Sequence, residues 1–574
     1  MATTLTLRHE RVDDIPVIIG LANQRQLPDI LDAHLGTHAL QRGLNNGQLT
    51  VGWLAYILSQ GDHRQSTVRE WANSLPHTLE RLLGQPLREV EFSDDRLSGI
   101  LRRLSDEEAW EAIEEDLWAA TMVVYELELT GIRLDSTTSY GYHQVTEEGV
   151  MPFGPSKDHR PDLPQLNLIA AAAEPSGHRL ASAVEPGRCA DDPLYTPLIQ
   201  RVRCLVGRTG LLYAGDCKMA ALPTRAELVA HGDSDLVPLP RTGETAAQFE
   251  SWVSALVDST QEATLVWDRG QLLGAGYEFE RALSATVDGQ PVHWTERVQV
   301  VRSRALAQRQ EATLERQLRA AEAELQALTP APGRGKRQIR EEATLQAAIA
   351  QVLARHEVGG LLAVRWERHE TTVTRDVGRG RGGPERPTRT DVQVRYGITG
   401  VQRHEMALAA RRHRLGWRAQ VTNAPADRLS LPAAVVYYRG GWSLERDFHL
   451  VKDLPLGLSP LFVWKEEQIK GLTHLLTLAL RLLTRLETQV RRALEQAQDT
   501  LAGLYEGQPT RTTERPTGKR LLKAFARVQI TLTHVEVGTS TCWHLTPLSP
   551  LHEHLLRDLR LPASLYAALA YNSS

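Results

Sequence analysis

Cysteine is scarce in this chain, with four residues in 574. They are Cys189, Cys204, Cys217 and Cys542, and no two of them have the C-x-x-C spacing of a zinc ribbon. So few cysteines in so long a chain also exclude a disulfide-rich scaffold and are typical of a reducing compartment. Because no His or Cys motif accompanies Cys217, we expect it to be a small buried residue rather than a nucleophile.

The chain also lacks a long apolar segment. Its most apolar stretch, "GLTHLLTLALRLLTRL", is interrupted by His474, Arg481 and Arg485. A membrane-spanning helix needs about 20 predominantly apolar residues, so we expect this stretch to form a buried helix instead. The first residues, "MATTLTLRHERVDD", show no apolar run or cleavage site of a signal peptide. The sequence therefore predicts a soluble cytoplasmic protein without a membrane partner.

No excess of positive charge marks the whole chain as a nucleic-acid binder. The formal net charge is −4, but phosphate binding depends on local patches, so the net value excludes little. The clearest patch is "TRDVGRGRGGPERPTRT", whose arginines are Arg375, Arg379, Arg381, Arg386 and Arg389. This predicted loop is either a solvated linker or a strap along a phosphate backbone, and the sequence leaves both interpretations open.

Hydrophobic periodicity divides the chain into regions of different character. The first region has apolar residues at helical spacing, and Ser105 and Glu108 form a capping-box pattern within it. The second alternates, with three consecutive strands followed by helix, strand, helix and strand, which indicates a mixed α/β sheet. The predicted regions are a helical N-terminal domain (1–128), the first part of the α/β core (129–245), an insertion with a helical hairpin and the basic loop (246–400), the second part of the core (401–500) and a C-terminal helical region (501–574). The periodicity does not indicate the function of the N-terminal domain.

Two aspartates stand where predicted strands end. Asp135 follows "ELELTGIRL", and Asp216 follows the short strand in "TGLLYAG". An aspartate after a strand is most often a turn former, but strand ends held by a rigid sheet are also good places for a site. Both interpretations stay open for each aspartate taken alone.

A third carboxylate, Glu445, lies in a helix predicted over "LSLPAAVVYYRGGWSLERDFHLVKD". Glu445, His449 and Lys452 form a row at the edge of the face predicted to be buried. That face is the stripe Leu444, Phe448 and Val451. Three carboxylates that converge without cations would repel one another, and divalent metal removes the conflict. Ligands that are all oxygen suit Mg²⁺ or Mn²⁺.

At this point the sequence resembles the insertion-sequence transposases of the DDE class, in the group with the signature Y-x₂-R-x₃-E-x₆-K. Tyr438, Glu445 and Lys452 match that signature in type and spacing, whereas Gly441 stands in the arginine slot. "IRLDSTTSYGY" and "LLYAGDCKM" resemble the segments that carry the two aspartates of the family. "PSKDHRPDLPQLNL" resembles the segment after the first aspartate, and the long gap before Glu445 resembles the family's insertion.

The resemblance implies a fold and a reaction. The expected fold is an RNase H-like catalytic core interrupted by a long insertion. Asp135, Asp216 and Glu445 are implied as catalytic residues and as ligands of two Mg²⁺ or Mn²⁺ ions. The expected activity is metal-dependent cleavage at transposon ends followed by strand transfer into target DNA, with a hairpin on the transposon end in some relatives.

The resemblance also implies DNA contacts and partners. The N-terminal helical region, 1–128, resembles the one found in this group and is expected to bind DNA ends. The residues expected to contact DNA are Tyr438, Arg439, Trp442, Lys452, Lys157 and Arg160. Arg439 lies two residues before the arginine slot and is the candidate substitute for the missing side chain. The expected partners are double-stranded DNA, as terminal inverted repeats and target, and a second copy of the chain in a homodimer. The expected location is the bacterial cytoplasm, at the nucleoid when DNA is bound.

Other interpretations remain open on the sequence alone. Gly441 is consistent with an inactive DNA-binding protein of transposase descent, and the same three carboxylates would also serve a metal-dependent nuclease without strand transfer. Trp442 is equally a core residue, and His449 is equally a satisfied residue at the helix rim. The charged run from Lys157 to Arg160 is either a DNA contact or a solvated turn.

Overall fold

The computed structural model forms two compact units. It describes residues 5–125, 129–143, 145, 148–257, 262–378, 387–452, 456–458, 461, 463–537 and 540–571. Unit 1 comprises Met1–Val237, Leu283–Trp294 and Tyr437–Ser574, and unit 2 comprises Pro238–Ala282 and Thr295–Val436.

Unit 1 contains a mixed α/β sheet, as the sequence predicts. Its strands are β2 (Gly131–Tyr140), β3 (Gln165–Glu174), β4 (His178–Pro186), β5 (Leu212–Ala214) and β6 (Ser234–Pro238). They lie in the order β4-β3-β2-β5-β6, with β2, β3 and β4 antiparallel and β5 and β6 parallel to β2. The helices α8 (Asp192–Val206) and α9 (Leu222–Ala230) connect β4 to β5 and β5 to β6. The predicted order of three strands, helix, strand, helix and strand is therefore confirmed.

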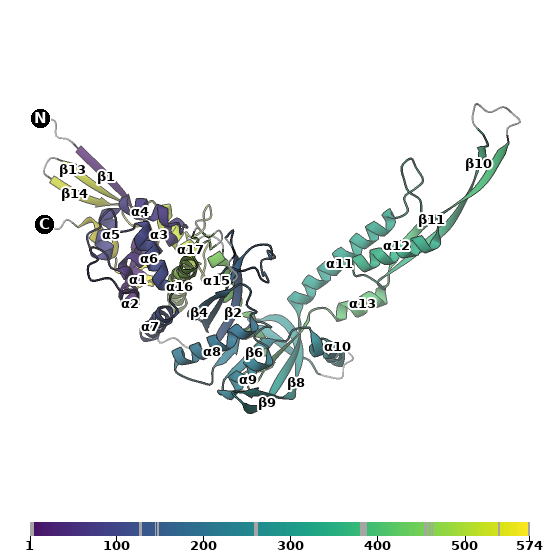
Figure 1. Ribbon diagram of the computed structural model, residues 1–574, viewed down its shortest axis with the longest axis horizontal. Helices are drawn as coiled ribbons and strands as arrows, with labels where there is room; N and C mark the ends of the chain where they lie inside the picture. The colour runs from purple at the N-terminus through teal and green to yellow at the C-terminus, as the bar shows by residue number, and fades with distance from the viewer. Residues whose placement is uncertain are drawn as a thin grey trace. The chain divides into compact units, whose positions relative to one another are not determined.

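The N-terminal region is helical, as predicted, but a strand precedes its helices (Figure 1). The helices are α1 (Ile15–Asn23), α2 (Leu27–Leu35), α3 (Asn46–Gln60), α4 (Gln65–Asn73), α5 (Pro76–Leu83), α6 (Asp94–Leu104) and α7 (Glu107–Tyr125). The strand β1 (Leu5–Arg11) pairs antiparallel with β13 (Thr531–Val537), which also pairs with β14 (Ser540–Leu545). Both regions predicted to be all-helical therefore contain strands, because a partner far away in sequence completes them.

A long buried helix organises the helical part of unit 1. It is α16 (Glu466–Ala497), which contains the apolar stretch predicted to be buried, and it packs against α3, α6 and β4. The remaining elements are α17 (Gly518–Arg527), α18 (Pro550–Asp558), α19 (Ser564–Ala567) and a short 3₁₀ helix (Ala568–Ala570). His474 of α16 lies stacked on Trp110, with ring centroids 4.2 Å apart. Within the described ranges, no helix has the length and apolar character that crossing a membrane requires.

Unit 2 contains the predicted helical hairpin together with strands that the sequence analysis missed. The hairpin is α11 (Arg304–Ala327) and α12 (Glu342–Arg355), packed through leucines such as Leu318 and Leu345. The other elements are α10 (Gly243–Val257), β7 (Thr264–Asp268), β8 (Gln271–Val287), β9 (Gln290–Ser303), β10 (Leu362–Asp376), β11 (Thr388–Arg403), α13 (Glu405–His413) and β12 (Trp417–Thr422). β12, β9, β8 and β7 are neighbours in that order, and β10 and β11 form a separate antiparallel pair.

The helix predicted around Glu445 is two helices. α14 (Leu431–Arg439) ends before Gly440 and Gly441, and α15 (Trp442–Lys452) follows directly. Two adjacent glycines weaken a helix by roughly 1 kcal/mol each relative to alanine, which explains the break. The predicted stripe is confirmed, because Leu444, Phe448 and Val451 are all buried.

Candidate active site

Asp135 lies in the middle of a strand of the unit 1 sheet. It is the fifth residue of β2, whereas the sequence analysis placed it at the end of a strand. That expectation is wrong because the strand continues to Tyr140, which pairs with Gln165 of β3. The backbone N–H of Ser136 donates a 2.8 Å hydrogen bond to Oδ1 of Asp135.

Asp216 follows the neighbouring strand β5 by two residues. β2 and β5 are parallel, and Arg133 pairs with Ala214, so Asp135 and Asp216 each stand two residues beyond the same pair. Neighbouring parallel strands run 4.7–4.9 Å apart, so this register brings the two aspartates to the same region of the sheet.

A buried tyrosine holds the carboxylate of Asp216. The hydroxyl of Tyr195, on α8, donates a 2.7 Å hydrogen bond to Oδ1 of Asp216. Burial and the charges of Asp216, Asp135 and Asp191 raise the pKa of Tyr195, so its hydroxyl keeps the proton that it donates. The N–H of Lys218 donates to the same oxygen at 2.9 Å.

The charges of the three predicted carboxylates meet at Asp135. Burial, with a smaller contribution from the charges of Asp216 and Glu445, raises the pKa of Asp135 to about 6 against the opposing effect of Lys157. Glu445 is exposed in the first turn of α15, which packs against β2. Three segments that are far apart in sequence therefore contribute negative charge to one place.

The carboxylates do not form a finished ligand set. Among the residues that the structure describes, no group of three or more His, Cys, Asp or Glu lies close enough together to hold a metal ion. Asp135, Asp216 and Glu445 nevertheless offer carboxylate oxygens, the donor chemistry that Mg²⁺ and Mn²⁺ prefer. Burial is the main cause of the raised pKa of Asp135, and a divalent cation would favour its charged form and offset the charges of Asp216 and Glu445.

Gly441, the departure from the family signature, lies against a guanidinium from another element. A Cβ atom added at Gly441 would come within 2.6 Å of Nη1 of Arg133. Arg133 is buried on β2, where it donates to Oε1 of Glu174 at 2.7 Å and to the carbonyl of Tyr437 at 2.9 Å. The space beside the helix break is thus filled by an arginine side chain from the sheet.

The other residues predicted to act from α14 and α15 differ in their surroundings. The guanidinium carbon of Arg133 lies 6.0 Å from the ring centroid of Tyr438. Arg439 is exposed at the end of α14, and His449 is exposed on α15. The side chain of Trp442 lies outside the described residues, so its predicted stacking role stays a prediction.

The lysines predicted to contact DNA are held by carboxylates. Nζ of Lys452 donates to both oxygens of Asp158, at 2.7 and 2.9 Å. Nζ of Lys157 donates to the carbonyl of Ser136 at 2.7 Å and pairs with Asp191 at 2.9 Å. Both lysines are thus fixed beside the strand that carries Asp135.

Arg160, the third basic residue predicted to contact DNA, lies on the surface. Its guanidinium forms two 2.8 Å hydrogen bonds with Asp162 and lies 5.4 Å from the ring centroid of Tyr140. Tyr140 ends β2, so Arg160 stands at the far end of the strand that carries Asp135.

Sequence reasoning missed two polar groups near the carboxylates and was wrong about a third. Tyr195 was missed although it shares the buried stripe of α8 with Leu198 and Ile199, where a hydroxyl needs a partner. Arg179 on β4 was also missed; it is buried, and its guanidinium carbon lies 5.2 Å from the ring centroid of Phe448. Cys217, expected to be buried, is exposed because the chain has left β5 by that point.

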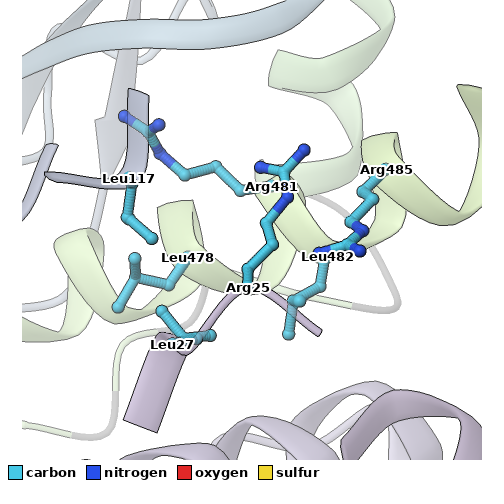
Figure 2. Close-up of a pocket in the computed structure, with 7 residues that line it drawn as sticks. All are labelled: Arg25, Leu27, Leu117, Leu478, Arg481, Leu482 and Arg485. Atoms are coloured by element: carbon cyan, nitrogen blue, oxygen red, sulfur yellow. The ribbon is translucent and has the colours of Figure 1, made fainter. Parts of the chain in front are cut away.

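A small cavity lies apart from these carboxylates, in the helical core of unit 1. It measures about 20 Å³, room for about one water molecule. Figure 2 shows Arg25 reaching between Arg481 and Arg485 of α16 at its wall. A space of this size excludes a nucleotide or another organic ligand.

Comparison with known proteins gives one distant similarity of interest. No protein-family model and no curated protein matches the sequence. Among solved structures, a chain from a cryo-EM structure of a piggyBac transposase synaptic complex with hairpin DNA matches with 10% sequence identity and a TM-score of 0.25. The match covers 50% of this chain and 62% of that chain. A similarity of this size fixes neither the fold nor the activity.

Proposed function

We propose that this chain is a DDE-class DNA transposase, which cuts the ends of a DNA element and joins them to target DNA. The observation that carries the proposal is geometric: the pairing of Arg133 with Ala214 places Asp135 and Asp216 on neighbouring parallel strands, and α15, which carries Glu445, packs against β2. Crowding three carboxylates is unfavourable unless cations come between them. Enzymes that cut phosphodiester bonds with two metal ions use such carboxylate sets.

The order of the elements supports an RNase H-like core around this site. β2, β3 and β4 follow one another and precede α8, β5, α9 and β6, and β2 lies between β3 and β5. Most of unit 2 is inserted in the chain between β6 and α15. The resemblance predicts an insertion at that place, between the second and third carboxylates.

In this proposal Asp135, Asp216 and Glu445 hold two Mg²⁺ or Mn²⁺ ions. Such ions supply activation of the attacking oxygen and stabilisation of the leaving oxygen. The chain's own groups prepare the carboxylates. Tyr195 fixes Oδ1 of Asp216 and orients its other oxygen, and Lys157 offsets part of the negative charge at Asp135.

The lysine pairs suggest how a DNA strand is received. Asp158 offers Lys452 two carboxylate oxygens, and a phosphate offers the same charge and oxygen chemistry. A phosphate of the DNA end can therefore replace Asp158 at Lys452. Tyr438, Arg439, Trp442, Lys157 and Arg160 complete the proposed DNA-binding set. Cutting two ends requires at least a homodimer in the complex with double-stranded DNA.

The test is cleavage of the inverted repeats that flank the gene. The protein is incubated with labelled repeat ends and Mg²⁺, next to Asp135→Ala, Asp216→Ala and Glu445→Ala variants of the same thermal stability. We expect specific cleavage by the natural protein and a loss of about a thousandfold or more in each variant, since central catalytic groups act as a unit. Equal cleavage by the natural protein and Asp135→Ala would refute the assignment.

A second assay separates the alternatives. Pre-cleaved ends with a free 3′ hydroxyl are mixed with a target plasmid, and joined products are counted. Joined products support a transposase, whereas cleavage without joining identifies a nuclease. Sequence-specific binding without cleavage identifies an inactive relative.

A further inference from the structure

The β10–β11 ribbon has two chemically different faces. One face packs on the helical hairpin through Val364, Trp366 and Ile398. Side chains alternate along a strand, so the odd-numbered residues of β10 and their pairing partners on β11 point away from the helices. The basic residues on this outward face are Arg365, His369, Arg375, Arg389 and Arg395.

Positive charges stand directly opposite one another on the outward face. Arg375 pairs across the ribbon with Arg389, and His369 pairs with Arg395. Like charges at opposed positions destabilise a strand pair, and an isolated two-stranded ribbon is marginal in water. Asp391 offsets one of these charges through its 2.8 Å ion pair with Arg389. The positive charge that remains in excess on this face suggests an anionic partner.

The charge is segregated between the two faces. The outward face carries four arginines against two carboxylates, Glu367 and Asp391. The other face of the distal ribbon carries Arg368 against Glu370 and Asp376, and Arg368 pairs with Glu370 at 2.5 Å. Positive charge is therefore in excess only on the side that points away from the helices.

The dimensions of the ribbon match a DNA duplex. Ten residues separate Arg365 from Arg375, which corresponds to about 33 Å of strand. One turn of B-form DNA is about 34–36 Å long, and its major groove accepts a two-stranded β-ribbon. Gly397 and Gly400 lie on the outward face, where they lower the steric barrier to close approach.

We propose that the outward face of β10–β11 binds the phosphate backbone of duplex DNA through Arg375, Arg395 and their neighbours. The inference deepens the proposed function and rests on it for the source of the DNA. The contacts are electrostatic, so they hold the duplex without reading its sequence. The ribbon thereby adds a second DNA contact, carried by unit 2, to the one proposed around Lys452.

The test is DNA binding by the full chain in EDTA, where no cleavage occurs. The probe is a fluorescein-labelled duplex of about four helical turns and arbitrary sequence, followed by anisotropy from 50 to 200 mM NaCl. The test variant is Arg375→Gln/Arg395→Gln, and the matched control is Arg368→Gln on the opposite face. Loss of two phosphate contacts should lower the salt-dependence slope by about two and weaken binding about tenfold at 100 mM NaCl. The control should behave like the natural protein.

Further arms make the outcome decisive. Arg375→Lys/Arg395→Lys should recover most of the affinity, because a phosphate contact needs the charge rather than the fork of the guanidinium. An unchanged slope in the glutamine variant would overturn the proposal. So would equal binding of an RNA duplex, or a dimer in DNA-free solution that the glutamine variant loses, since the face would then contact a second copy.

Failure of this inference is separable from failure of the proposed function. If the DNA ends are not cleaved but the salt-dependence slope still falls in Arg375→Gln/Arg395→Gln, the DNA-binding face of the ribbon is supported and the transposase assignment is refuted. If the DNA ends are cleaved and the salt-dependence slope is unchanged, the transposase assignment is supported and DNA binding by the ribbon is refuted.

Discussion

In unit 1 the charges around the sheet are buried and paired, whereas on the outward face of the ribbon of unit 2 they are exposed and positive charge is in excess. Arg133 with Glu174, and Arg481 with Glu114, lie inside the core. Arg375 and Arg389 stand opposite each other on the surface. A buried charge that loses its partner is expensive, but an exposed charge costs little when it is removed. Substitutions in the two regions should therefore affect different measurements, namely stability in unit 1 and binding in unit 2.

The largest expected effect on stability is at Glu114. This carboxylate is fully buried, accepts from Ser182 Oγ at 3.0 Å, and pairs with Arg201 at 2.5 Å and with Arg481. Glu114→Gln removes the counter-charge of Arg481 and leaves Arg201 only the exposed Glu111, at 3.6 Å, so the free energy of unfolding should fall by about 3–5 kcal/mol. Denaturant unfolding measures it. Asp391→Asn, which removes the ion-pair partner of Arg389 on the exposed ribbon, should leave the midpoint unchanged. Equal midpoints for both variants would contradict the contrast between the two regions.

A smaller effect of the opposite sign is expected at Asp14. Burial raises the pKa of Asp14 to about 7 in the folded protein, although Ser59 donates a 2.7 Å hydrogen bond to it. Below about pH 4 both states hold the proton. Between about pH 4 and 7 only the folded state holds it, so stability falls as the pH rises and then levels off. Asp14→Asn should therefore be more stable than the natural protein at pH 8, by up to about 4 kcal/mol, because the pKa rises by about 3 units and each unit corresponds to about 1.4 kcal/mol.

The measurement for Asp14 is the difference in stability between variant and natural protein at two pH values. It should be close to zero at pH 4 and large at pH 8. A difference that is the same at both pH values would show that the buried carboxyl is not responsible.

At the proposed site, Tyr195→Phe removes the hydrogen bond to Asp216 and little else. Groups that orient metal ligands typically contribute 10- to 100-fold to metal affinity or activity. We expect cleavage to need about tenfold more Mg²⁺ while the melting temperature changes little. Tyr56→Phe is the matched control, because Tyr56 also donates to an aspartate, Asp62, at 2.7 Å. An equal Mg²⁺ requirement in both variants would remove Tyr195 from the site.

The smallest expected effect is at the helix break. Gly441→Ala places a methyl group within 2.6 Å of Nη1 of Arg133, whose contacts to Glu174 and Tyr437 limit its movement. Overpacking of this kind costs about 1–3 kcal/mol. Gly99→Ala in α6 is the control, because nothing lies within 4 Å of the added atom. It should stabilise the helix by up to about 1 kcal/mol, and a stabilising Gly441→Ala would contradict the contact.

The sequence predicts the elements whose signal is local. The apolar alternation of β2 and β3 and the helical periodicity of α16 can be read from neighbouring residues. The strands β1 and β13 carry polar residues between their apolar ones. Their regular pairing is visible only when the two strands, which are far apart in the sequence, are aligned. The distal ribbon has no buried face, so no apolar pattern reveals it.

The candidate site divides in the same way. The order of the motifs singles out Asp135, Asp216 and Glu445. Their catalytic roles are implied by the family resemblance and are tested by the assays above. A side chain at position 441 would collide with Arg133, and only the fold brings these two residues, far apart in the sequence, together. Tyr195 carries a local signal, a hydroxyl on an apolar stripe, but its partner Asp216 belongs to another element.

The pairing of β1 with β13 sets the earliest time at which unit 1 can finish folding. His9 and Thr533 are hydrogen-bonded at 3.0 Å although 524 residues separate them. At about 5–20 residues per second, a ribosome needs on the order of half a minute or more to supply the partner of β1. Until then β1 is an open strand edge, the kind of surface that pairs with other chains. Unit 1, and with it the proposed site, is therefore completed only after translation has passed β13.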